Sequence, residues 1–84
     1  MRARLSLLID LPETDPSYRY TVDALEHAIS ARRAPVDVVI ARSDAIGRLG
    51  DGVFIGPGSP YRDNDAMESA IERARRLGIP LVGT

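Results

Sequence analysis

Short apolar runs of strand length alternate with longer amphipathic segments along the 84-residue chain. The runs lie at residues 5–9, 36–41, 52–56 and 79–82, and they are almost continuously apolar or rich in β-branched side chains. Runs of this kind are typical of strands that are buried on both faces of a parallel sheet. Because helical segments separate the first pair of runs and the last pair, we expect an α/β domain with right-handed crossovers.

The first helical segment is expected to begin at Asp15 and Pro16, since an N-cap aspartate followed by proline is a common helix start. Four residues spaced by four, three and four positions form its apolar face: Tyr18, Val22, Leu25 and Ile29. Pro35 ends the segment. Tyr20 and His27 fall outside this apolar face, and both are therefore expected to face solvent.

The second helical segment is expected to begin between Asp63 and Asp65 and to end before Gly78, which suits the position after a helix. Its apolar face is predicted to contain five residues: Met67, Ala70, Ile71, Ala74 and Leu77. One short helical turn is also expected within residues 45–49. Four strands and two main helices together predict a three-layer, flavodoxin-like parallel sheet, of which this chain forms a half-domain.

Composition excludes several classes of function. The net charge is −1 and the arginines are scattered, so neither a nucleic acid nor an anionic membrane is expected as a partner. The chain has no Cys and one His, which rules out disulfides, Cys catalysis and a Cys/His zinc site within these residues. We expect no metal and no cofactor. No apolar run is long enough to span a bilayer, and a cytoplasmic location is therefore expected.

Ligands of open parallel sheets bind beyond the carboxyl ends of the strands, where four segments of this chain converge. These are residues 10–13, 41–43, 56–59 and 83–84. The glycine-rich turn at residues 56–59 precedes a helix, so its N–H groups can hold an oxyanion or a phosphate. The alternative is a tight turn with no ligand. Asp10 precedes a Leu-Pro pair and is interpreted as a turn residue rather than as a catalytic partner of Glu13.

Three segments together carry a resemblance to a known family. Residues 20–28, 50–59 and 70–84 resemble, in order, the first helix, the strand leading into the Pro-Gly-Gly turn, and the helix and strand before the nucleophile of class I glutamine amidotransferases. The closest likeness is to the C-terminal glutaminase domains of CTP synthases. The resemblance covers nearly the whole chain, and it implies that residues 1–84 are the N-terminal half of such a domain.

The resemblance implies a function in pyrimidine nucleotide metabolism. Enzymes of this family bind glutamine, hydrolyse it with a Cys-His-Glu triad and pass the ammonia to a synthetase site. Gly56, Gly58 and Ser59 would form the oxyanion and substrate-binding turn, although Ser59 stands where the family has a second glycine. Thr84 would immediately precede the nucleophile. The catalytic residues themselves lie outside the 84 residues, so this chain alone is expected to be inactive.

Two further hypotheses stay open beside the resemblance. One is a non-catalytic, flavodoxin-like binding module that forms dimers, and the other is a small protein that binds a phosphate or a nucleotide at residues 56–59. We also expect the chain either to form homo-oligomers or to require a C-terminal half. An ending at the expected nucleophile is consistent with a selenocysteine codon read as a stop, with a true stop codon or with a designed boundary.

Overall fold

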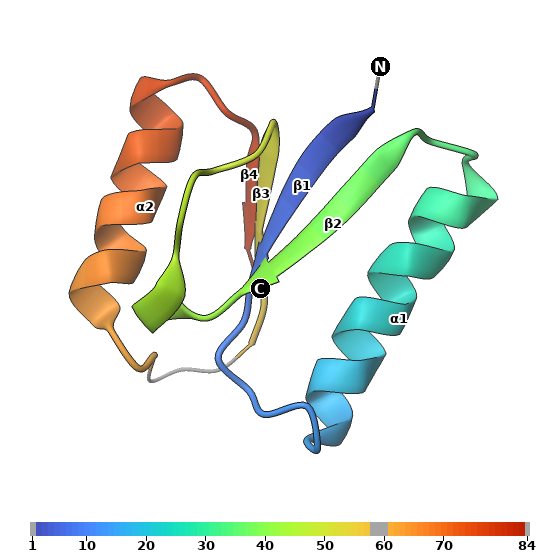
Figure 1. Ribbon diagram of the computed structural model, residues 1–84, viewed down its shortest axis with the longest axis horizontal. Helices are drawn as coiled ribbons and strands as arrows, with labels where there is room; N and C mark the ends of the chain where they lie inside the picture. The colour runs from blue at the N-terminus through green and yellow to red at the C-terminus, as the bar shows by residue number, and fades with distance from the viewer. Residues whose placement is uncertain (1, 58–60, 84) are drawn as a thin grey trace.

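A parallel sheet lies between two helices in the computed structural model, which describes residues 2–57 and 61–83 (Figure 1). The strands of this part are β1 (Ala3–Leu8), β2 (Val36–Ala41), β3 (Gly52–Ile55) and β4 (Leu81–Gly83). The helices are α1 (Pro16–Ala31), the 3₁₀ helix η1 (Ser43–Ala45) and α2 (Asn64–Arg76). The strand order is β2-β1-β3-β4 and all pairs are parallel. This confirms the predicted α/β class and the flavodoxin-like topology.

The core is centred on β1, which pairs with β2 on one side and β3 on the other. Leu7, Leu8 and Ile9 are at most 1% exposed, so the end of this strand is covered on both faces. Leu8 packs in one cluster with β3 and with three buried residues of α2. Those residues are Met67, Ala70 and Ala74. The predicted apolar face of the second helix is therefore correct at these three positions.

Both main helices begin with an aspartate cap, which the sequence predicts for the first of them. The Asp15 side chain accepts a hydrogen bond from the Ser17 N–H at 2.8 Å, and Pro16 is the first helical residue. Asp63 caps α2 by accepting from the Ala66 N–H at 2.9 Å. These bonds satisfy backbone donors that have no partner inside the helix.

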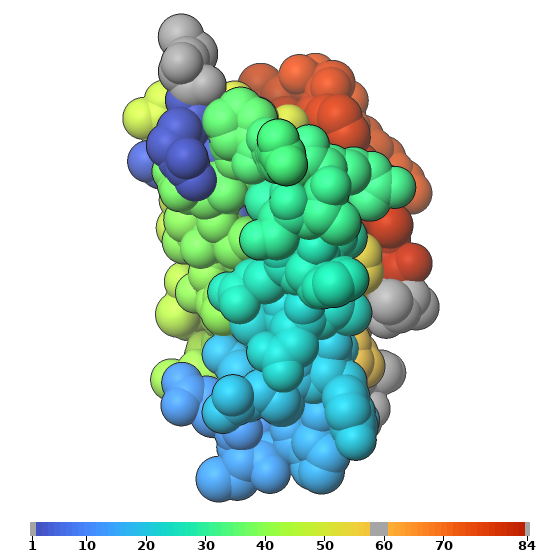
Figure 2. All heavy atoms as spheres, turned by 90° about the vertical axis from the view of Figure 1, so that its right-hand side faces the viewer, coloured from blue at the N-terminus to red at the C-terminus, as the bar shows by residue number. Residues whose placement is uncertain are grey.

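The surface of one side of the molecule is formed largely by α1 (Figure 2). None of its 16 residues is fully buried, although the predicted inner face is partly covered. Tyr20 is 74% exposed and His27 is exposed, as predicted. Within residues 2–57 and 61–83, no helix is long and apolar enough to cross a membrane.

Some predicted details of the second half are wrong. Leu77 is 66% exposed because it is the C-cap residue of α2, beyond the turns that face the sheet. Ile79 packs against the core instead, after Gly78 reverses the chain with φ +69°. The last strand begins at Leu81 rather than residue 79, because Pro80 has no N–H to donate to the sheet. The short helical turn lies at Ser43–Ala45, earlier than residues 45–49.

The amino-terminal edge of the sheet is closed by the loop before β3. The Asp51 N–H donates to the Arg4 carbonyl at 2.7 Å, and the Asp51 side chain accepts from the Arg4 N–H at 2.8 Å. Next to them, the Gly50 N–H donates to the Ser6 hydroxyl at 2.8 Å. These three bonds fix the loop to β1 and set the position from which β3 starts.

Candidate functional site

A buried carboxylate joins three segments at the carboxyl edge of the sheet. One oxygen of Asp10 accepts from the Ser43 N–H at 2.7 Å, and the other accepts from the Ser43 hydroxyl at 2.6 Å and the Arg62 N–H at 2.7 Å. The Ser43 oxygen in turn accepts from the Asp63 N–H at 2.9 Å. This carboxyl-edge network (Asp10, Ser43, Arg62 and Asp63) therefore holds the end of β1, the end of β2 and the start of α2 together.

The two central side chains of the network are nearly free of solvent, since Asp10 is 7% exposed and Ser43 is 1% exposed, whereas Arg62 and Asp63 are exposed. Burial by itself raises the pKa of Asp10, but the hydrogen bonds from Ser43 and Arg62 and the charge of Arg62 outweigh it. The net effect holds the pKa of Asp10 below its ordinary value. With three donors on its two oxygens, this carboxylate acts as a structural acceptor that orients the strand ends.

A pocket of about 610 Å³ lies beside the network, over the ends of β1 and β2. Its walls come from the β1–α1 loop, the first turn of α1, the end of β2 with the following η1, and Arg62 before α2. The lining residues are Ile9, Leu11, Pro12, Glu13, Tyr18, Ile40, Ala41, Arg42, Ala45 and Arg62. Its volume is within the range of small-molecule sites, roughly 300–1,000 Å³.

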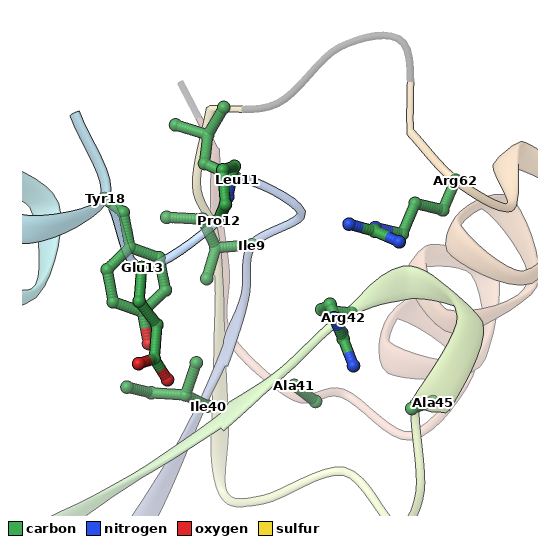
Figure 3. A pocket seen from close by; sticks show the side chains of 10 residues that line it. All are labelled: Ile9, Leu11, Pro12, Glu13, Tyr18, Ile40, Ala41, Arg42, Ala45 and Arg62. Carbon is green, nitrogen blue, oxygen red and sulfur yellow. The ribbon is translucent and has the colours of Figure 1, made fainter. Parts of the chain in front are cut away.

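The pocket is charged differently on its two sides (Figure 3). Arg42 and Arg62 lie on one side, and the guanidinium group of Arg62 extends toward Ile9. Glu13 and Tyr18 lie on the opposite side, near Ile40. Apolar side chains therefore lie between a cationic wall and an acidic wall, an arrangement that suits a ligand with different groups at its two ends.

The structure brings together two of the four segments that the sequence placed at this edge. Residues 10–13 and 41–43 meet in the network and the pocket. Gly56 is buried against Ile9, and its N–H donates to the Leu8 carbonyl at 2.9 Å. Gly83 ends β4 and does not line the pocket. Gly58, Ser59 and Thr84 lie outside the described residues.

Sequence reasoning missed the two polar groups that organise this edge. Asp10 is a buried acceptor for two distant segments rather than a simple turn residue, because Ser43 and Arg62 fold over it. Arg62 has no ion pair within 4.0 Å among the described residues, but its backbone N–H is held by Asp10, while the next residue, Asp63, caps α2. An acidic residue directly after a buried apolar run was the available signal for the network.

Comparison with known proteins adds no relative: no protein-family model, curated protein or solved structure matches the chain. Among residues 2–57 and 61–83, no group of three or more His, Asp or Glu side chains could hold a metal ion.

Proposed function

We propose that this chain is the N-terminal half of a glutamine amidotransferase-like domain, similar to the glutaminase domain of CTP synthases. The half-domain supplies one wall of the glutamine site and the turn for the oxyanion, while the nucleophile and its base belong to residues outside these 84. The ammonia produced would serve pyrimidine nucleotide metabolism, as the resemblance implies.

The observation that carries the proposal is the position of Gly56 and Pro57 directly after β3. They follow β3, which pairs with β1 on one side and β4 on the other. The turn after them therefore starts in the middle of the carboxyl edge, where doubly wound folds bind their ligands. In the resembling family this turn presents N–H groups to the tetrahedral oxyanion, and Gly58 and Ser59 are the residues assigned to it.

The carboxyl-edge network supports the same proposal. The N–H of Arg62 is held by Asp10, and the N–H of Asp63 is held by Ser43. Both of these donors lie directly before α2, so the start of this helix is fixed to the ends of β1 and β2. Oxyanion stabilisation requires a fixed framework of this kind around the groups that face the transition state.

The purified 84-residue chain is expected to release no ammonia from glutamine above a heat-killed sample. The chain has no Cys, and a serine hydroxyl needs an adjacent base to act as a nucleophile. In contrast, the protein isolated from the cells that make it is expected to be longer and to react with a diazoketone analogue of glutamine. Mass spectrometry of the labelled peptide measures both properties.

Labelling of the purified 84-residue chain and of the protein isolated from cells gives results that distinguish the hypotheses. Labelling at a Cys or selenocysteine that follows Thr84 supports the proposal, and the 84-residue chain serves as the matched unlabelled control. A cellular protein of 9.1 kDa that the analogue does not modify contradicts it. Ammonia release by the purified chain would contradict the assignment of the nucleophile to residues outside it.

A second candidate is a non-catalytic module that works as a dimer, and exposed apolar side chains on the edge strands favour it. Val39 and Ile40 on β2 are 46% and 41% exposed, and Val82 on β4 is 57% exposed. Both strands are edges of the sheet, with unpaired backbone groups on one side. Self-association through either edge would bury these side chains.

We expect the isolated chain to sediment as a concentration-dependent mixture of monomer and larger species. Val82→Arg should shift this mixture toward monomer, because a charge on the β4 edge opposes pairing and burial there. Tyr20→Arg is the control, since Tyr20 is 74% exposed and belongs to α1 rather than to an edge strand. A sharp monomer at high concentration that binds no hydrophobic dye would rule out self-association.

A further inference from the structure

We propose that the pocket over the ends of β1 and β2 binds a nucleoside monophosphate, with its phosphate at Arg42 and Arg62 and its base at Glu13 and Tyr18. The proposed contacts use other residues than the turn assigned to the oxyanion, so the proposal does not depend on the glutaminase proposal. The inference rests on the opposite charge of the two walls and on the apolar surface between them (Figure 3).

The two arginines of the cationic wall are available to bind an anion. The backbone of Arg62 is fixed by its N–H bond to Asp10, whereas its guanidinium group makes no ion pair or side-chain hydrogen bond with any described residue. Arg42 has one acidic neighbour, Asp44, at the long distance of 4.0 Å. Two guanidinium groups with little internal pairing on one wall suit a phosphate, which accepts several charge-assisted hydrogen bonds.

Two acids lie near this wall, Asp44 beside Arg42 and Asp10 beside Arg62, and neither lines the pocket. The oxygens of Asp10 are occupied by three donors, and Asp10 itself does not line the pocket. Asp44 lies outside the pocket, in η1. Glu13 is the acid of the opposite wall (Figure 3). Among the lining residues, the one carboxylate is therefore that of Glu13, on the wall opposite the arginines.

The opposite wall suits a hydrogen-bond donor on an aromatic ring. Glu13 offers a carboxylate acceptor, and Tyr18 offers a ring face next to it (Figure 3). Leu11 and Pro12 lie between the walls, and Ile40, beside Glu13 and Tyr18, is 41% exposed on the edge strand β2 (Figure 3). A nucleobase with an amino group satisfies both the acceptor and the apolar surface, which inorganic phosphate or a simple sugar phosphate cannot do.

Three probes separate the two ends of the ligand in titrations of the 84-residue chain followed by NMR amide shifts. Adenosine 5′-monophosphate carries both ends, ribose 5-phosphate only the anion, and adenosine only the base. The nucleotide should bind most tightly. Arg62→Ala should weaken the nucleotide and the sugar phosphate by about tenfold and leave adenosine unchanged.

Glu13→Gln should change the affinities for the three probes in the opposite pattern. It should weaken the nucleotide and adenosine, and it should strengthen ribose 5-phosphate because a negative charge leaves the pocket. Arg75→Ala, at an exposed position of α2 outside the pocket, is the charge-matched control and should change none of the three affinities. The free energy of unfolding of each variant shows that the fold is retained.

Three results would overturn the proposal. The first is the absence of shifts at the amides of Leu11, Glu13 and Ala41 with all three probes. The second is equal weakening by Arg62→Ala and Arg75→Ala, which would mean that the nucleotide responds to the overall charge of the protein rather than to this pocket. Binding of the sugar phosphate as tight as that of the nucleotide would restrict the ligand to a plain anion and would equally reject the nucleoside assignment.

Discussion

Asp10→Ala is expected to lower the free energy of unfolding by about 3–5 kcal/mol, a large part of the stability of a domain of this size. The change removes the acceptor of three hydrogen bonds and leaves the Ser43 N–H, the Ser43 hydroxyl and the Arg62 N–H without it. Ser43 is 1% exposed, so water cannot easily replace the carboxylate. Chemical denaturation followed by circular dichroism measures the effect.

Two matched controls distinguish the loss of the hydrogen-bond network from the loss of a negative charge. Asp10→Asn keeps the shape of the side chain and one acceptor oxygen, so it should lower the free energy of unfolding by less, about 1–2 kcal/mol. Asp44→Ala removes an exposed carboxylate whose ion pair is 4.0 Å long, and it should cost at most about 0.5 kcal/mol. A loss for Asp10→Ala no greater than that for Asp44→Ala would contradict the structural role of the network.

The contribution of the Asp10 carboxylate to the free energy of unfolding depends on pH. The pKa of Asp10 is lower in the folded chain than in the unfolded chain, so the unfolded state takes up the proton first as pH falls. The stabilisation is therefore complete above the ordinary carboxyl pKa of about 4 and is lost as pH falls through the lower, folded pKa. The difference in stability between the wild-type chain and Asp10→Ala should narrow over that acid range.

Gly50→Ala is expected to destabilise the chain by about 2–3 kcal/mol. A Cβ atom at this position would collide with the Arg4 carbonyl oxygen and lie 2.9 Å from the Arg4 carbonyl carbon. These are backbone atoms of β1, and the same oxygen accepts the Asp51 N–H at 2.7 Å. The strand or the loop must shift, and thermal unfolding should show a clear fall in Tm.

Gly47→Ala is the matched control in the same loop. A Cβ atom there would meet nothing within 4 Å, and the residue does not have positive φ. Alanine restricts the unfolded chain more than glycine does, so this change should be neutral or stabilising by about 0.4–1 kcal/mol. Equal losses for the two variants would show that the contact between Gly50 and Arg4 is not what fixes the loop.

The elements that the sequence predicts well are those whose signals are local. Asp15 and Pro16 form a helix start within three residues, and Val36–Ala41 is a strand with the predicted bounds. Gly78 has the left-handed conformation that its place after α2 indicates. In each case the residue types that determine the backbone lie next to one another in the chain.

The candidate site could be predicted only in outline, because its contacts are not local. The rule for parallel sheets correctly brought residues 10–13 and 41–43 to one edge. It could not show that Asp10 would be held by Ser43 and Arg62, which are 33 and 52 positions away. The prediction that Leu77 belongs to the apolar face of the second helix was wrong for a related reason. Helical periodicity does not tell where the helix leaves the sheet.

During synthesis, the contacts of the carboxyl-edge network can form only in a fixed order, because its members lie far apart along the chain. Asp10 can meet Ser43 only after β1, α1 and β2 have been made, and it can meet Arg62 only after β3 has followed. Until residue 62 has left the ribosome, the carboxylate lacks one of its three donors, and each closure must first overcome the entropy of a long loop. The edge that carries both proposed binding sites is thus among the last parts of the nascent chain to become rigid.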